Sequence, residues 1–409
     1  MVPNGWSNTC IDDNITFSGG AQPPREVFKF EPEEGYIRLI QIRDYKSDKF
    51  ITYVPKKLAK KFCTADDVMI GRYGPPIFQI LRGIEGAYNV ALIKAIPKSG
   101  VDKEFMYYFL KRDPLLRVIE SFSQRTSGQT GIEMDVLKAY PMHLPPLPEQ
   151  RKIAQILSTW DRGIATTEKL IDARKQQKKA LMQQLLTGKK RLVDPETGKK
   201  FEGDWEEVKL SHFFDRVTEK NKGQSTNVVT ISAQHGLIRQ EEFFKKSVAS
   251  ETLDNYFILR KGQFAYNKSY SNGYPMGAIK RLNRYEDAVV TSLYICFELK
   301  NEQLASSCFM EQYFESGLLN RGLTKVAAEG GRAHGLLNVK PSDFMALAIT
   351  APQLNEQQKI ASVLTAADKE IELLEAKLVH FKQEKKALMQ QLLTGKRRVK
   401  VEHMEEATC

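Results

Sequence analysis

Several loops of this 409-residue chain carry side chains that can hydrogen-bond to nucleic-acid bases. Amides, hydroxyls, arginine and lysine match the donor and acceptor patterns of base edges, and aromatic rings offer stacking surface. Arginine and lysine in such loops also contact phosphates, which carry no sequence information. For any single residue, a surface or fold-supporting role is an equally good interpretation. The candidates are Arg43, Lys46, Arg72, Tyr73, Gln124, Arg125, Thr126 and Gln129 in the first part of the chain and Gln234, His235, Lys268, Tyr270, Asn272, Tyr274, Arg332 and His334 in the second.

Sequence motifs for catalysis are missing. An adenine methyltransferase holds its flipped base with an Asn/Asp-Pro-Pro-Tyr/Phe turn, and residues 74–77 (Gly-Pro-Pro-Ile) lack both its polar and its aromatic member. No glycine-rich dinucleotide or ATP motif occurs. Residues 194–199 superficially resemble a nuclease carboxylate–lysine cluster, but their Pro and Gly favour a turn. The five cysteines form no Cys-x-x-Cys pair, so we expect no metal site, no cofactor and no active site.

The net charge of +11 suggests a polyanionic partner. Most of the excess lies in residues 148–200, which hold 13 basic and 6 acidic side chains. A solvated helix face explains these lysines as well as DNA binding does. No apolar run approaches the roughly 20 residues of a membrane span, and the N-terminus does not resemble a signal peptide. We expect a cytoplasmic protein with free thiols.

The chain contains a long internal repeat. Residues 178–189 (Lys-Lys-Ala-Leu-Met-Gln-Gln-Leu-Leu-Thr-Gly-Lys) recur unchanged as residues 385–396, which is 207 positions later. Aligned without gaps, residues 148–189 and 355–396 share 23 identities over 42 positions. A repeat at this distance indicates that two similar halves make up the chain.

Both copies predict long helices of the coiled-coil type. Apolar residues alternate in steps of four and three, which is the 3.5-residue period of a coiled-coil seam. Lys178 and Lys385 interrupt the seam, and we expect these polar positions to fix the register of an antiparallel pair. An alternative is that each apolar stripe packs on its own domain. The predicted seam residues are Ile153, Leu157, Trp160, Ile164, Ile171, Lys178, Leu181, Leu185, Ile360, Leu364, Ile371, Leu374, Leu378, Phe381, Lys385, Leu388 and Leu392.

The remaining sequence predicts an α+β protein in the order domain, helix, domain, helix. In the first domain we expect strands at 36–42, 67–71 and 89–96 and a helix at 104–121, and strands at 228–231, 260–266 and 289–297 repeat this plan in the second. The predicted segments are two globular domains (1–147 and 204–354), two helices (148–188 and 355–395), a linker (189–203) and a charged tail (396–409).

Two antiparallel helices of about 40 residues, related by a rough twofold axis, form a rod of about 60 Å. Such a rod spans roughly 17 base pairs. Nearly identical helices that carry two different domains therefore suit a split DNA site with two unlike halves and an unread gap.

This organisation resembles the specificity subunit of type I restriction–modification systems. The resemblance rests on the domain order, the two approaches at residues 144–150 and 351–357, and the two Leu-Leu-Thr-Gly-Lys helix ends. The second approach departs mildly, with Gln353 and Asn355 where the first has Pro146 and Pro148. The match extends over essentially the whole chain.

The resemblance implies two target-recognition domains that read a bipartite DNA sequence, and helices that set the gap. It also implies a non-catalytic subunit whose partners are double-stranded DNA, two methyltransferase subunits and two motor–nuclease subunits. S-adenosylmethionine, ATP and Mg would then bind to those partners. From the residues alone, a two-lobed adaptor for proteins or glycans stays an alternative, and an enzyme with its own active site is the weaker one.

Overall fold

The computed structural model describes residues 2–126, 129–243, 252–327 and 337–401. The chain forms two compact units: unit 1 is residues 1–168 and 377–409, and unit 2 is residues 169–376. Each unit contains one globular domain and one half of each of two long helices, α5 (Leu147–Leu185) and α11 (Leu354–Leu392). Arg332, His334 and residues 402–409 of the predicted tail lie outside the described residues.

The two long helices begin and end in the same way. Each has 39 residues, and each ends shortly before a glycine in the left-handed region, Gly188 (φ 70°) and Gly395 (φ 68°). A positive φ at this position reverses the chain and lets a later N–H reach the last free carbonyls. The Lys190 N–H donates to the Gln184 carbonyl at 3.1 Å, and the Arg397 N–H to the Gln391 carbonyl at 3.2 Å.

Within each unit the halves of α5 and α11 pack antiparallel. In unit 1, Asp161 pairs with Lys385 and Glu168 with Lys382, so the α11 number falls as the α5 number rises. Trp160 and Phe381 meet edge to face with ring centroids 5.5 Å apart. In unit 2, Arg174 pairs with Glu370 and Lys178 with Asp368. Every residue predicted for the seam is buried or partly buried.

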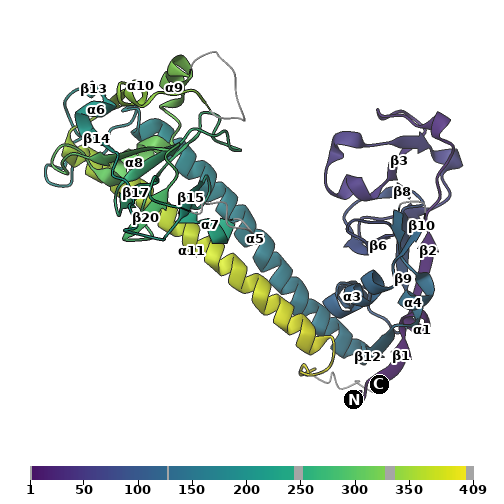
Figure 1. The fold of residues 1–409 in the computed structure, drawn as a ribbon. Coiled ribbons are helices and arrows are strands. Elements are labelled where there is room, and N and C mark those ends of the chain that lie inside the picture. Colours follow the sequence, from purple (N-terminus) through teal and green to yellow (C-terminus); the bar gives the residue numbers. More distant parts are fainter. Residues whose placement is uncertain (1, 127–128, 244–251, 328–336, 402–409) are drawn as a thin grey trace. The chain divides into compact units, whose positions relative to one another are not determined.

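The domain of unit 1 has two four-stranded sheets, ordered β2-β9-β6-β7 and β4-β3-β8-β5, and only β3 and β8 pair in parallel. Strand β1 pairs with β12 beside the helices, and the second sheet lies on the side of the first away from them (Figure 1). The strands are β1 (Ser7–Cys10), β2 (Ile15–Gly19), β3 (Tyr36–Ile40), β4 (Tyr53–Pro55), β5 (Phe62–Cys63), β6 (Val68–Gly71), β7 (Gln79–Leu81), β8 (Gly86–Tyr88), β9 (Leu92–Pro97), β10 (Gln124–Thr126), β11 (Gln129–Gly131) and β12 (Pro141–Leu144). The short helices are α1 (Ile11–Asn14), α2 (Lys103–Leu110), α3 (Asp113–Ser121), α4 (Met134–Ala139), η1 (Arg25–Val27), η2 (Ile42–Tyr45), η3 (Asp48–Phe50) and η4 (Lys56–Leu58).

The single helix predicted at residues 104–121 is wrong, because two helices occupy this region. Helix α2 ends at Leu110, and Pro114 starts the first turn of α3. Proline has no N–H and its ring clashes with the preceding turn, so it ends one helix and is tolerated at the start of the next. The apolar faces of both helices still reach one core, since Phe105, Phe109 and Ile119 are all buried in it.

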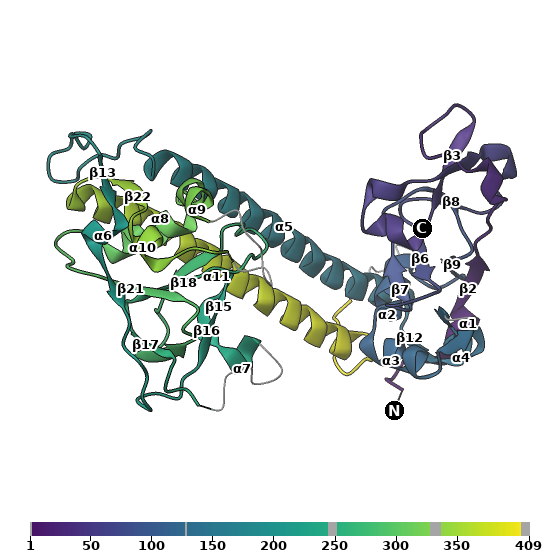
Figure 2. The ribbon, with the colours of Figure 1, turned by 45° about the horizontal axis from the view of Figure 1, so that its top comes forward.

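The domain of unit 2 repeats this plan in part, with two two-stranded ribbons where unit 1 has its second four-stranded sheet. Its four-stranded sheet has the order β14-β21-β18-β19, and β13 pairs with β22 as β1 does with β12. The ribbons β15-β16 and β17-β20 lie on the far side of this sheet from α6 and α10 (Figure 2). The elements are β13 (Glu206–Lys209), α6 (Leu210–Phe213), β14 (Phe214–Val217), β15 (Val229–Ser232), β16 (Gly236–Arg239), α7 (Gln240–Phe243), β17 (Phe257–Arg260), β18 (Phe264–Asn267), β19 (Ala278–Arg281), β20 (Asp287–Val290), β21 (Ile295–Leu299), α8 (Ser307–Glu315), α9 (Asn320–Val326), α10 (Pro341–Met345) and β22 (Ala348–Ala351).

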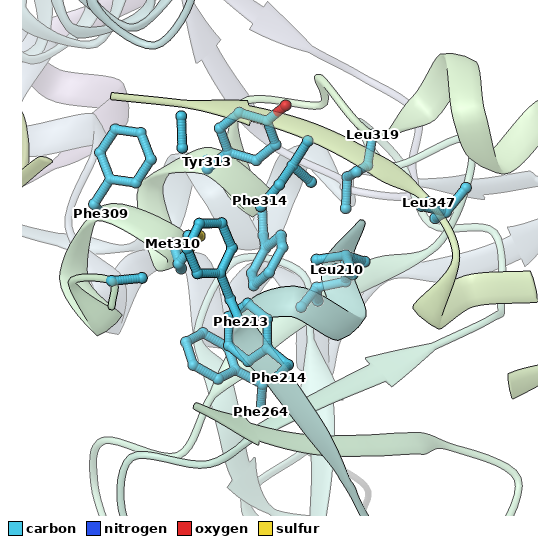
Figure 3. Packing of buried hydrophobic residues seen from close by; sticks show 14 of the residues in the cluster. Leu210, Phe213, Phe214, Phe264, Phe309, Met310, Tyr313, Phe314, Leu319 and Leu347 are labelled. Carbon is cyan, nitrogen blue, oxygen red and sulfur yellow. The ribbon is translucent and has the colours of Figure 1, made fainter. Parts of the chain in front are cut away.

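An aromatic core joins this sheet to its helices. Phe214, Phe264 and Phe314 pack with ring centroids 5.5–5.7 Å apart (Figure 3). The same core includes Leu185 of α5 and Ile360 of α11, so the domain packs directly on the helix ends of its own unit. The single strand predicted at 289–297 is wrong, because residues 291–294 separate β20 from β21, which belong to different sheets.

Candidate nucleic-acid interface and helix junctions

In unit 1, Arg43 lies on an exposed surface that combines cations with aromatic rings. Its guanidinium lies 5.5 Å from the ring centroid of Phe50 and donates to the Phe50 carbonyl at 3.4 Å. Phe30 and Phe50 are 71% and 54% exposed, although large aromatic side chains are normally buried. With Lys49 and neighbouring residues they line a pocket of about 890 Å³. Lys46, which follows η2, is exposed but does not line this pocket.

The structure brings two other predicted loops of unit 1 together. Arg72 and Tyr73 follow β6, and the Arg72 guanidinium lies 5.5 Å from the Tyr73 ring centroid. Tyr73 pairs with Gly131 of the β10-β11 hairpin, and the Ile132 N–H donates to the Arg72 carbonyl at 3.2 Å. Gln124, Arg125, Thr126 and Gln129 lie on this hairpin.

In unit 2 the side chains of the predicted loops differ in their exposure to solvent. Gln234 and His235 are exposed in the turn between β15 and β16. Tyr270, 68% exposed, and Asn272 project from the β18–β19 loop. Lys268, in the same loop, is partly buried.

Tyr274 is held by neighbours within the domain. Its hydroxyl donates to Glu315, and Lys280 contacts both partners, at 2.5 Å from the Glu315 carboxylate and 3.2 Å from the hydroxyl. Burial and the Glu315 charge raise the pKa of Tyr274 well above its usual range. This network supports the loop, so Tyr274 is less available to an external partner than Tyr270.

A second group of polar contacts lies where the long helices meet, and we call these sites the helix junctions. At the start of α5, the buried Glu149 carboxylate accepts two bonds from Arg398, at 2.7 and 2.8 Å, and one from the Trp6 indole at 3.1 Å. At the start of α11, the buried Glu356 accepts two bonds of 2.7 Å from Arg191. The start of each long helix thus binds an arginine just beyond the end of the other.

The glutamine after each of these glutamates ties the helix to its domain. Gln150 accepts the Asp102 N–H at 2.8 Å and donates to the Pro145 carbonyl at 2.8 Å. Gln357 accepts the Ser306 N–H at 2.9 Å and donates to the Pro352 carbonyl at 2.8 Å. Asp102 and Ser306 are the N-caps of α2 and α8, so each glutamine orients a domain helix against the proline-rich approach.

The polar seam lysines complete the junctions. Lys385 contacts Asp161 at 2.5 Å, and Asp161 also accepts the Tyr108 hydroxyl of α2 at 2.8 Å. Burial and this carboxylate raise the pKa of Tyr108 well above its usual range, so the hydroxyl remains a donor.

Unit 2 repeats the lysine–aspartate contact of the seam, but the domain residue that bonds the aspartate is a glutamine instead of a tyrosine. Lys178 contacts Asp368 at 2.6 Å, and Asp368 accepts the Gln312 amide of α8 at 2.8 Å. One carboxylate in each unit therefore connects the two long helices and one domain helix.

The sequence interpretation named the two lysines but missed their partners. Glu149, Gln150 and Asp161 are among the identities of the repeat, and each recurs 207 positions later. Arg191 and Arg398 also lie 207 positions apart, just beyond the aligned stretch. Charged residues that repeat at the domain period are the signal that could have identified the junctions.

Comparisons with known proteins agree with this organisation. The family model described as "Type I restriction modification DNA specificity domain" matches residues 3–174 and 202–382. These two matches cover most of the chain, one in each half. The chain therefore belongs to the type I restriction–modification DNA specificity family.

Two curated relatives come from Methanocaldococcus jannaschii. The MjaVIII type I restriction enzyme specificity subunit is 27% identical over 427 aligned positions, which cover 98% of this chain and 94% of that protein. The putative MjaX specificity subunit is 26% identical, covering 80% of this chain and 74% of that protein.

Solved structures share the fold at low sequence identity. The type-I restriction-modification S subunit from M. genitalium has a TM-score of 0.56 and 14% identity, covering 96% of this chain and 99% of that one. The HsdS subunit from Thermoanaerobacter tengcongensis has a TM-score of 0.50 and 15% identity, covering 97% of this chain and 98% of that one. Among the residues that our structure describes, no helix has the length and apolar character needed to cross a membrane.

Proposed function

We propose that each globular domain reads one half of an asymmetric, bipartite DNA site and that α5 and α11 set the gap between the halves. The observation that carries this proposal is the contrast between repeated junctions and unlike domain surfaces. Glu149 and Glu356 each pair with an arginine, Arg398 and Arg191, and Asp161 and Asp368 each pair with a seam lysine. The loops available for base contacts share no such repeat. A constant scaffold with two different surfaces suits recognition of two different half-sites.

The predicted base-contacting loops remain our candidates, and some of their side chains are better placed to contact DNA than others. In unit 1 the surface around Arg43 and Phe50 and the loop of Arg72 and Tyr73 combine arginine with an aromatic ring. Arginine can bond guanine edges or phosphates, and exposed rings offer stacking surface. In unit 2 the exposed Gln234, His235, Tyr270 and Asn272 offer amide, imidazole and aromatic groups.

In this proposal the chain is a non-catalytic subunit that directs adenine methylation and restriction by its partners. The helix stretches 178–189 and 385–396 are identical and expose the same residues, such as Ala180 and Ala387 or Gln184 and Gln391. Two copies of one methyltransferase subunit can bind two copies of one surface. Two motor–nuclease subunits would complete the restriction complex.

The test is to co-express the chain with its methyltransferase subunit in a host that lacks adenine methylation and to sequence the DNA by a single-molecule method. We expect one methylated motif with two unlike halves and a fixed gap. A complex of normal size that leaves the DNA unmethylated would contradict the proposal.

A further inference from the structure

In unit 1 the start of α3 lies beside the last turns of α11 (Figure 1). A strongly basic pocket is lined by residues of both elements. Its volume is about 380 Å³, roughly a dozen times the ~30 Å³ that one water molecule occupies in the liquid. It can therefore hold an anionic group together with hydration water. Its lining includes seven cationic side chains: Lys111, Arg112, Arg117, Lys382, Lys385, Lys386 and Lys396.

The negative charge around the pocket does not balance these cations. Among the described residues of its lining, Asp113 is the one acidic residue, and it pairs with Lys386 at 2.7 Å. Lys382 and Lys385 pair with carboxylates on α5. Among the described residues, Arg112, Arg117 and Lys396 have neither a side-chain hydrogen bond nor an ion pair. Within the part of the chain that the structure describes, three positive charges of the pocket lining thus have no counterion.

Arg112 is the most informative of the three. Its guanidinium lies 4.9 Å from the ring centroid of Phe109, and the residue is only partly exposed. Burial lowers the pKa of Arg112, and among the described residues no carboxylate pairs with its guanidinium. Partial burial of an unpaired cation is unfavourable unless an anion binds beside it. A bound anion would also be hydrogen-bonded by the guanidinium in a defined orientation.

The repeat supplies an internal comparison. In unit 2 a pocket of about 590 Å³ is lined by Lys179, Met182, Gln183, Thr187 and Lys189, and the helix residues at these repeat positions in unit 1 are identical. The opposite wall, however, contains Tyr274, Glu315 and Ser316 instead of lysine and arginine. The excess positive charge of the unit 1 pocket therefore comes from its domain wall, which is not repeated.

We propose that the pocket at Arg112, Arg117 and Lys396 binds a backbone phosphate of the target DNA, and that unit 2 has no equivalent phosphate site. This inference rests on the proposed function. It adds that the chain binds the asymmetric DNA site in one orientation, because only unit 1 has the phosphate site. An acidic segment of a partner subunit could also supply an anion. A partner present in two copies would need the pocket in both units, whereas an asymmetric DNA site does not.

The experiment measures binding to duplex DNA as a function of salt, using the full chain in its complex with the methyltransferase subunits. The test variant combines Arg112→Gln, Arg117→Gln and Lys396→Gln, and the matched control combines Lys199→Gln and Lys200→Gln, two exposed lysines of the linker in unit 2. Each phosphate contact contributes about 0.9 to the slope of log K against log salt. We expect the slope to fall by about one contact in the test variant and to stay unchanged in the control, with the same methylated motif in both.

A further variant, Arg112→Lys with the other two cations intact, keeps the charge and should retain most of the wild-type slope. This result would separate loss of charge from loss of packing on Phe109. An unchanged slope in the triple variant would overturn the phosphate site, and loss of the methyltransferase subunits would instead assign the pocket to that partner. If the wild-type complex shows no salt-dependent DNA binding, the proposed function itself fails.

Discussion

At the scale of residues, the helix junctions depend on two buried carboxylates. Glu149 and Glu356 are 3% and 2% exposed, and burying a carboxylate is costly unless it is paired and hydrogen-bonded. Two parallel guanidinium bonds satisfy each of them. The Trp6 indole adds a third bond to Glu149, whereas the buried indole nitrogen of the corresponding Trp205 has no hydrogen-bond partner among the described residues. The two junctions therefore share their ion pair but differ in its surroundings.

Replacing Arg398 with Gln should destabilise unit 1, because Glu149 would stay buried without its cation. Removing one partner of a fully buried pair costs about 3–5 kcal/mol. The Arg398 side chain is 44% exposed, so we expect about 2 kcal/mol. Calorimetry should show a lower melting temperature, and adding Glu149→Gln should recover part of the loss. Arg397→Gln, at an exposed neighbour, is the control, and an equal effect of both single changes would argue against a specific ion pair.

At the scale of elements, one lysine–aspartate contact in each unit joins the two long helices across their seam. A shift of one heptad would move each lysine about 10 Å along the helix from its aspartate. Because Asp161 and Asp368 also bond Tyr108 and Gln312, the same shift would disturb the attachment of the domains. Polar seam positions can specify register in this way, at some expense of stability.

We expect the double variant Lys178→Leu and Lys385→Leu to lose its single register. Leucine suits an apolar seam, so the helices should still pair, but in more than one alignment. The methylated motif should then occur with more than one gap length. Lys169→Leu with Lys369→Leu, at exposed helix positions, is the control and should keep one gap. If the Lys178 and Lys385 variant also keeps one gap, the register hypothesis is wrong.

The sequence predicts the regular elements better than the interruptions between them. The repeat and its 3.5-residue period indicate both long helices, and alternation finds β3, β6 and β9. Periodicity could not separate α2 from α3, or β20 from β21, because the apolar pattern continues across each break. In the candidate interface, a loop sequence does not reveal that Tyr274 is bound to Glu315, since that contact depends on tertiary packing.

At the scale of the whole molecule, the chain combines structural elements that occur twice with surfaces that occur once. The repeated parts are the long helices and their junctions, and the unrepeated parts are the domain loops and the basic pocket at Arg112. In the function proposed above, the identical surfaces bind identical partners, and the unlike surfaces bind the two different halves of the DNA site. If this proposal holds, we expect mutations to change assembly with the partner subunits and recognition of DNA separately.

We expect the length of the two long helices to determine the gap without affecting which half-sites are recognised. Inserting one heptad of the seam pattern after Glu168 and a second after Ala376 keeps every seam residue in phase. Each helix then grows by about 10 Å, and at ~3.4 Å per base pair the unread gap should lengthen by about three base pairs. Sequencing of methylated DNA should show both half-sites unchanged. The control is one heptad inserted in a single helix, which misaligns the lysine–aspartate contacts of one unit and should abolish methylation. A double insertion that methylates the original motif with the original gap would show that the helices do not measure the distance.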